Sequence, residues 1–214
     1  MKKILSLLLV AATFVSFNAQ AQDAKAKAIL DKLSGKIKTM TSLKANFVFT
    51  MNDAKGASKG SKSGSFTMQG NKFKVVMPAQ QIICDGRTVW TYLVSDKEVQ
   101  VANYDPNAQS ISPAKLFSGS YSKDFKSVYG GEKTISGKKV DVIEMTPVSA
   151  KGFKKVVLYV DKTTSMINGG IMYDKAGSSY GYTISGVTPN AKVAATDFTF
   201  DAKKNPGVEV VDLR

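Results

Sequence analysis

The chain has 214 residues, a formal net charge of +13 and a hydrophobic content of 43%, which together fit one globular domain with a basic surface. It contains no histidine, which excludes a Ser–His or Cys–His catalytic pair and an imidazole-bound zinc. Its single cysteine, Cys84, excludes an internal disulfide. The lysines are scattered along the chain rather than interleaved with stacking aromatics, so the positive charge does not predict nucleic-acid binding.

The first 21 residues have the layout of a secretory signal peptide. Two lysines follow Met1, residues 4–17 form an apolar run, and Ala19 and Ala21 are the small residues that a signal peptidase reads. A membrane anchor is the alternative, but the apolar run is shorter than the ~20 residues that span a bilayer core. The sequence therefore predicts a signal peptide over residues 1–21, cleaved after Ala21, followed by a single exported domain over residues 22–214.

An amphipathic helix is predicted directly after this segment. Apolar residues recur at steps of three or four from Asp23, a candidate N-cap, to about Met40, and lysines occupy the opposite face. The basic face could lie on a membrane surface, or the apolar face could pack over a sheet, and we favour the second interpretation. The apolar positions are Ala26, Ile29, Leu30, Leu33, Ile37 and Met40.

From Leu43 onward, apolar and polar residues alternate, which is typical of β-strands. Residues 52–63 are rich in Gly, Ser and Lys and predict a loose connection, whereas Asp85-Gly86 predicts a two-residue type I′ hairpin turn. The predicted strands cover residues 43–51, 66–68, 73–77, 82–84, 88–93, 99–101, 139–145, 153–160, 165–173, 180–187 and 197–200, with a tail over residues 207–211.

A short insert interrupts the strands. Residues 113–119 read as one or two helical turns that begin with Pro113 and end at Gly119, and residues 121–129 fit either a short helix or irregular chain. Ser112 and Lys115 match the Ser-x-x-Lys of penicillin-recognising enzymes, but the accompanying motifs are incomplete, so we predict no catalytic site.

A sheet of about eleven strands has a larger concave face than one helix and a short insert can fill. The aromatic and methionine side chains at period two therefore predict an apolar cavity that accommodates a lipid chain. Which alternate residues of each strand face the cavity stays open, because a shift of one residue turns every side chain of the strand to the opposite face. The predicted lipid-binding residues are Phe47, Phe49, Phe66, Met68, Phe73, Val75, Trp90 and Tyr92, and the lid carries Leu116 and Phe117.

Several strings, in order, resemble the periplasmic outer-membrane lipoprotein carrier family (LolA-type). The most specific is residues 85–92, which resembles the family's Ser-Asp-Gly-Lys-Thr-Leu-Trp-x-Tyr hairpin. Residues 112–117 stand where that family has a short lid helix. Residues 197–200 and 205–208 resemble its closing Phe-Thr-Phe and Pro-x-Gly-Val. The resemblance covers nearly the whole chain after the signal peptide.

This resemblance implies a mainly β (α+β) fold, an incomplete antiparallel β-barrel of about eleven strands in which an N-terminal helix and lid helices enclose an apolar cavity. It implies a periplasmic, monomeric carrier rather than an enzyme, with no cofactor and no metal. Such a carrier takes acylated lipoproteins from an inner-membrane lipoprotein-releasing transporter to an outer-membrane acceptor. The chain lacks the family's Arg after the second strand, and Gln69 stands there as a predicted uncharged lid latch. A lipid- or lipoprotein-sensing module that acts through protein contacts is the alternative.

Overall fold

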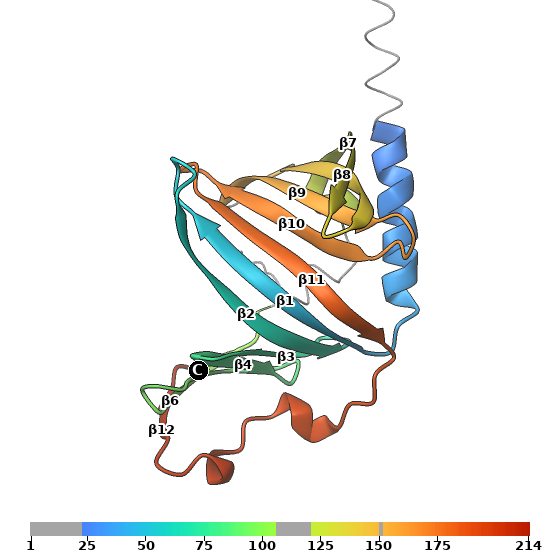
Figure 1. The fold of residues 1–214 in the computed structure, drawn as a ribbon. Coiled ribbons are helices and arrows are strands. Elements are labelled where there is room, and N and C mark those ends of the chain that lie inside the picture. Colours follow the sequence, from blue (N-terminus) through green and yellow to red (C-terminus); the bar gives the residue numbers. More distant parts are fainter. Residues whose placement is uncertain (1–22, 106–120, 150–151) are drawn as a thin grey trace, which may run out of the picture.

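A single open sheet of twelve strands dominates the fold. The computed structural model describes residues 23–105, 121–149 and 152–214. The sheet curves around a long helix over residues 23–38 (Figure 1). Its order is β12-β6-β5-β4-β3-β2-β1-β11-β10-β9-β8-β7, and only the pair β12–β6 is parallel. The predicted incomplete antiparallel barrel with an N-terminal helix is confirmed, with twelve strands rather than about eleven.

The element bounds follow the alternating pattern of the sequence in most places. The strands are β1 Leu43–Asn52, β2 Ser58–Gln69, β3 Lys72–Met77, β4 Gln80–Cys84, β5 Thr88–Leu93, β6 Glu98–Asn103, β7 Phe125–Ile135, β8 Lys138–Pro147, β9 Phe153–Asp161, β10 Ile167–Asp174, β11 Ser179–Pro189 and β12 Glu209–Asp212. The short helices are α3 Tyr121–Asp124, η1 Ala195–Phe198 and η2 Ala202–Lys204.

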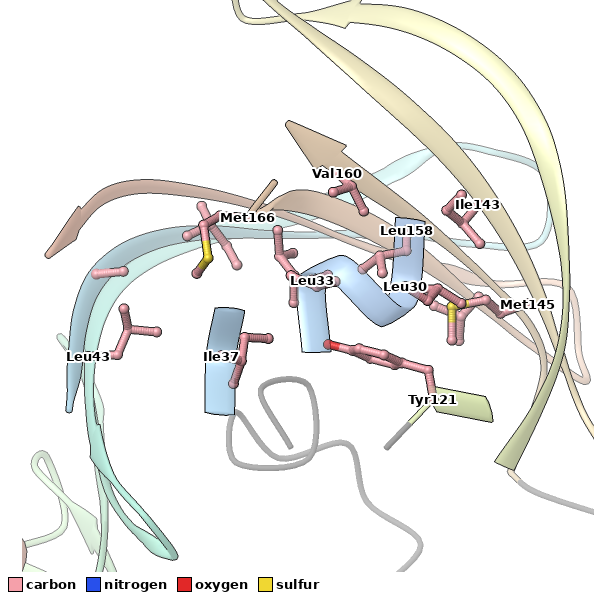
Figure 2. Close-up of a cluster of buried hydrophobic side chains, with 14 of the residues drawn as sticks. Leu30, Leu33, Ile37, Leu43, Tyr121, Ile143, Met145, Leu158, Val160 and Met166 are labelled. Atoms are coloured by element: carbon pink, nitrogen blue, oxygen red, sulfur yellow. The ribbon is translucent and has the colours of Figure 1, made fainter. Parts of the chain in front are cut away.

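The long helix packs its apolar stripe against the inner face of the sheet, which we define as the face that the helix contacts. Its residues Leu30, Leu33 and Ile37 are buried, as the 3.6-residue period requires. They meet β8 and β9 side chains such as Ile143 and Leu158 (Figure 2). Each of these buried helix side chains contributes about 2 kcal/mol, so the predicted packing over a sheet is confirmed.

No helix in the described parts of the chain is both long enough and apolar enough to cross a membrane. The predicted signal peptide over residues 1–21 lies outside the described residues.

Strand β1 joins the two halves of the sheet, because it pairs with β2 on one side and with β11 on the other. The turn before β1 is tied to the end of β11 by Asn190, whose Oδ1 accepts from the Thr41 N–H at 2.9 Å and whose own N–H donates to the Ser42 carbonyl at 2.8 Å. Asn190 has a φ of 55°, a left-handed conformation that asparagine tolerates better than most residues. These contacts fix where the helix enters the sheet.

After β11 the chain crosses the outer face of β3–β6, and it then adds β12 in parallel beside β6 (Figure 1). In this crossing segment Phe198 is fully buried, and the Phe200 ring lies 5.3 Å from the Tyr92 ring. The strand predicted over residues 197–200 is wrong. The Asp197 carboxylate accepts from the Ala194 N–H and closes the η1 turn instead.

Two loop predictions also need correction. The turn at Asp85-Gly86 is not type I′, because only Gly86 has a positive φ, of 94°. The Asp85 carboxylate accepts from the N–H groups of Arg87 and Thr88 and shapes a longer turn. The connection predicted over residues 52–63 is shorter, since β2 begins at Ser58. Backbone pairing with β1 makes this segment a strand although its side chains are polar on both faces.

We expect Phe198→Ala to lower the free energy of unfolding by about 3–5 kcal/mol, because a fully buried aromatic side chain leaves a cavity. Phe200→Ala is the matched control, since Phe200 is partly exposed in the same segment and its loss should cost less. Urea unfolding followed by fluorescence measures both variants. Equal losses in the two variants would contradict the assignment of Phe198 as the anchor of the crossing segment.

Candidate functional site

Large side chains on the inner face remain partly exposed around β1, β10 and β11. Directly paired residues share one face of a sheet, and the register places Phe49 beside Tyr182 and Met51 beside Tyr180. Tyr180 in turn pairs with Met172 on β10. We call this set the inner patch. It consists of Phe47, Phe49, Met51, Met172, Tyr180 and Tyr182, all neither fully buried nor fully exposed.

The rings of the inner patch are held by stacking and by one hydrogen bond. The Phe49 and Tyr180 rings stack at 6.2 Å with an interplanar angle of 19°. The Tyr180 hydroxyl donates to the Asp174 carboxylate at 3.3 Å. These contacts limit the rotation of the two rings and keep their faces available on the inner side of the sheet.

Two glycines let aromatic rings approach the backbone closely. A methyl group at Gly64 would lie 2.7 Å from the Phe47 ring, and one at Gly170 would lie 2.6 Å from the Tyr182 hydroxyl. Contacts this short are essentially never made by a real Cβ, so both positions require glycine. The rings of Phe47 and Tyr182 therefore lie low over the neighbouring strands β2 and β10.

The Tyr182 hydroxyl is the one polar group buried within the inner patch that has no hydrogen-bond partner among the described residues. Burial raises the pKa of Tyr182 far above its usual range, so the hydroxyl keeps its proton. An unpaired buried hydroxyl costs about 1–3 kcal/mol. It is therefore ready to donate to a carbonyl or hydroxyl oxygen of a bound molecule.

The structure brings together six of the eight residues predicted to bind lipid. Phe47, Phe49, Phe66, Met68, Phe73 and Val75 all lie on the inner face, because each pairs with another member of the buried core or of the inner patch. Phe66, Phe73 and Val75 are buried within the core, so they support the face rather than offer free surface.

The prediction is wrong for Trp90 and Tyr92, which lie on the outer face. Phe73 pairs with Cys84, and Cys84 pairs with Val89, so Val89 continues the inner face into β5. Trp90 and Tyr92 have the opposite parity, and Tyr92 packs against the crossing segment. A two-residue turn at Asp85-Gly86 would pair Cys84 with Arg87 and give the same parity, so the error lies in the choice of the larger alternate side chains of β5 as the inner ones.

The predicted latch and lid have different outcomes. Gln69 pairs with Lys72, is exposed and has the parity opposite to Met68, so its position gives no support to a latch that reaches the inner face. Leu116 and Phe117 lie outside the described residues, and their role as a lid stays a prediction.

Sequence reasoning missed the part of the inner patch that comes from the second half of the chain. Tyr180 and Tyr182 alternate within β11, which is the signal that could have identified them. Met172 lies on β10 beside them. They lie beside Phe49 only because β1 pairs with β11. These strands are more than a hundred residues apart, and no local sequence pattern indicates that they pair.

A separate groove crosses the outer face of β1–β4. It is lined by Val48, Val76, Pro78 and Val94, among others, and Val48 is 44% exposed. Its rim carries polar side chains such as Ser65, so it is the competing surface for an apolar ligand.

The described residues hold no group of three or more Cys, Asp or Glu side chains that could bind a metal ion. The inner patch itself contains aromatic rings, thioethers and two phenols. This composition can hold hydrocarbon chains by burial of apolar surface and can fix a polar group through the Tyr182 hydroxyl.

Residues 38–201 match the family described as outer membrane lipoprotein carrier protein LolA. The chain belongs to this family. Among curated proteins, it is 28% identical over 166 residues to the uncharacterised protein MJ0687 of Methanocaldococcus jannaschii. That match covers 74% of this chain and 47% of the relative, so the chain spans about half of that relative's length.

Solved structures share the fold at low identity. An uncharacterised conserved protein from Thermus thermophilus superposes with a TM-score of 0.59 at 12% identity, over 88% of this chain and 99% of that one. LprF from Mycobacterium bovis superposes with a TM-score of 0.50 at 15% identity, over 80% of this chain and 96% of that one. MucB superposes with a TM-score of 0.51 at 15% identity, over 84% of this chain and 64% of that one. These similarities support the fold of this LolA-family chain and leave its ligand open.

Gly170→Ala should lower the free energy of unfolding by about 1–3 kcal/mol, because the added methyl would lie 2.6 Å from both the Val157 carbonyl oxygen and the Tyr182 hydroxyl. The backbone carbonyl cannot rotate away as a flexible side chain can. Gly152→Ala serves as the control, since a methyl there meets nothing within 4 Å. Thermal unfolding compares the two, and equal melting temperatures would disprove the close approach at Gly170.

Proposed function

We propose that this LolA-family protein is a non-enzymatic carrier that binds acyl chains on the inner patch during transport between membranes. The observation that carries the proposal is a cluster of partly exposed aromatic and methionine side chains on the inner face of a rigid open sheet. Exposed apolar surface of this kind is rare on soluble proteins unless it binds something. Family membership supports acylated lipoproteins as the cargo.

The energetics of an acyl chain explain why a carrier is needed. Each methylene costs about 0.8 kcal/mol to expose to water, so a chain of about fifteen methylenes costs ~12 kcal/mol. Phe49, Tyr180 and Met172 offer flat and flexible apolar contacts that offset much of this cost without demanding one chain shape. Binding on a partly exposed face also allows release, because the chain does not have to leave a closed core.

The proposed route places the protein in the periplasm. The signal-peptide layout of residues 1–21 supports export, and family membership supports a route from an inner-membrane lipoprotein-releasing transporter to an outer-membrane acceptor. We propose both as partners. The basic surface, with 30 Lys and Arg against 17 Asp and Glu, suits repeated contact with anionic membranes at the two ends of this route.

Phe49→Glu should weaken binding of the neutral fluorescent probe N-phenylnaphthylamine by about tenfold or more, because a carboxylate would have to lose water inside the apolar patch. Val48→Glu is the matched control. Val48 is the preceding residue of β1, so it points to the outer face and into the competing groove. We expect its affinity to stay within about twofold of the wild type.

The pair of variants decides between the two faces. Loss of binding in Val48→Glu with normal binding in Phe49→Glu would assign the ligand to the outer groove and refute the proposed site. Normal binding in both variants would refute an apolar ligand at either place. Circular dichroism confirms that each variant is folded before its affinity is compared.

A further inference from the structure

A lysine stands at the end of the inner patch on the same face of the sheet. Lys62 on β2 pairs with Phe49, and Phe49 pairs on its other side with Tyr182. These three residues therefore form a row across three strands that runs from a buried hydroxyl, over an aromatic ring, to an exposed ammonium group. Neighbouring strands lie about 4.8 Å apart, so the row spans roughly 10 Å at the backbone.

The two hairpin tips around this row carry excess positive charge. The tips over residues 52–62 and 174–179 meet where a methyl on Gly177 would lie 3.3 Å from the Ala54 Cβ atom. Together they contain two aspartates, Asp53 and Asp174, and four lysines. The lysines are Lys55, Lys59, Lys62 and Lys175.

Both aspartates of the tips are already engaged. The Asp53 carboxylate pairs with the Lys59 ammonium at 3.0 Å and accepts from two backbone N–H groups of its own turn. The Asp174 carboxylate accepts from the Ser178 N–H and from the Tyr180 hydroxyl. Lys62 makes no ion pair within residues 23–105, 121–149 and 152–214, so its charge faces solvent beside the inner patch without compensation.

We propose that this end of the inner patch binds the anionic headgroup of an acyl lipid, in which Lys62 contacts the phosphate and the Tyr182 hydroxyl donates to an ester carbonyl. The inference rests on the acyl-chain site of the proposed function and adds a second ligand class for that site, a phospholipid, because the lipid anchor of a lipoprotein carries no phosphate. The ester meets the unpaired Tyr182 hydroxyl at one end of the row, and the phosphate reaches Lys62 at the other end, where the long lysine side chain bridges the remaining gap. The glycerol segment that joins ester and phosphate crosses the Phe49 ring between them, and the acyl chains extend from the ester over the rest of the inner patch.

The test compares two lipids that share acyl chains, esters and phosphate and differ in the headgroup alcohol, so that choline cancels the phosphate charge in one and glycerol leaves it in the other. Dioctanoyl phosphatidylglycerol and dioctanoyl phosphatidylcholine displace N-phenylnaphthylamine from the purified protein, and the half-displacing concentrations are measured. We expect the anionic lipid to bind roughly three- to tenfold more tightly, the range of one partly screened ion pair. Added salt should reduce this preference without changing the affinity for phosphatidylcholine.

Three variants test which side chains cause the preference for phosphatidylglycerol. Lys62→Glu should remove or invert the preference for phosphatidylglycerol and should weaken phosphatidylcholine less, because choline already offsets the charge of its phosphate. Lys44→Glu makes the same change of net charge on the outer face of β1 and should keep the preference. Tyr182→Phe removes only the unpaired hydroxyl, so the fold should be no less stable, and both lipids should bind about threefold or more weakly because they share the ester carbonyl.

The outcomes separate this inference from the proposed function. Equal binding of the two lipids by the wild type, or an equal loss of preference in Lys62→Glu and Lys44→Glu, would overturn the headgroup site while the acyl site stands. Displacement of the probe by free glycerol phosphate at the same concentration would overturn it too, since it would show an anion site without a lipid. Failure of both lipids and of the probe to bind would overturn the proposed function itself.

Discussion

An open sheet cannot bury its own concave face, and this constraint governs the rest of the structure. The long helix over residues 23–38 covers the part formed by β8 and β9, where Ile143 and Leu158 are fully buried. On β1, β10 and β11 the aromatic and methionine side chains of the inner patch, which lie on the same face, are only partly covered. A closed barrel or a second long helix would have buried them. The inner patch is therefore a consequence of how little helix the chain supplies for so wide a sheet.

The outer face of β3–β6 has a packing contribution of its own, apart from the core under the helix. The crossing segment buries Phe198 over β3–β6, where Ile83, Val99 and Val101 form a small core of their own. It then ties β12 to the edge strand β6. This half of the sheet is therefore packed on both faces, since Phe73, Val75 and Cys84 are buried in the core on the inner one. A carrier benefits from such an arrangement, since ligand can enter and leave without loss of the main packing that holds the sheet.

The sequence predicts the helix and the strands better than it predicts which side chains of each strand lie on the inner face of the sheet. The helix over residues 23–38 and most strands follow from periodicity, because burial on one face leaves a regular trace. The inner orientation of Phe47 and Phe49 also follows from this alternation. Trp90 and Tyr92 were misplaced because both faces of β5 carry apolar side chains, and the crossing segment that packs against Tyr92 on the outer face comes from the far end of the chain. Tyr180 and Tyr182 were missed because only the long-range β1–β11 pairing brings them to Phe49.

The central claim is that an acyl chain lies on the inner patch, and intermolecular nuclear Overhauser effects test it most directly. The protein is labelled with ¹³C on its aromatic and methionine side chains and mixed with unlabelled dioctanoyl phosphatidylcholine. The account predicts cross-peaks from acyl-chain protons to the Phe49 ring and the Met172 methyl, and none to Trp90 or Phe200 on the outer face. Cross-peaks confined to outer-face residues, with none to Phe49 or Met172, would contradict it.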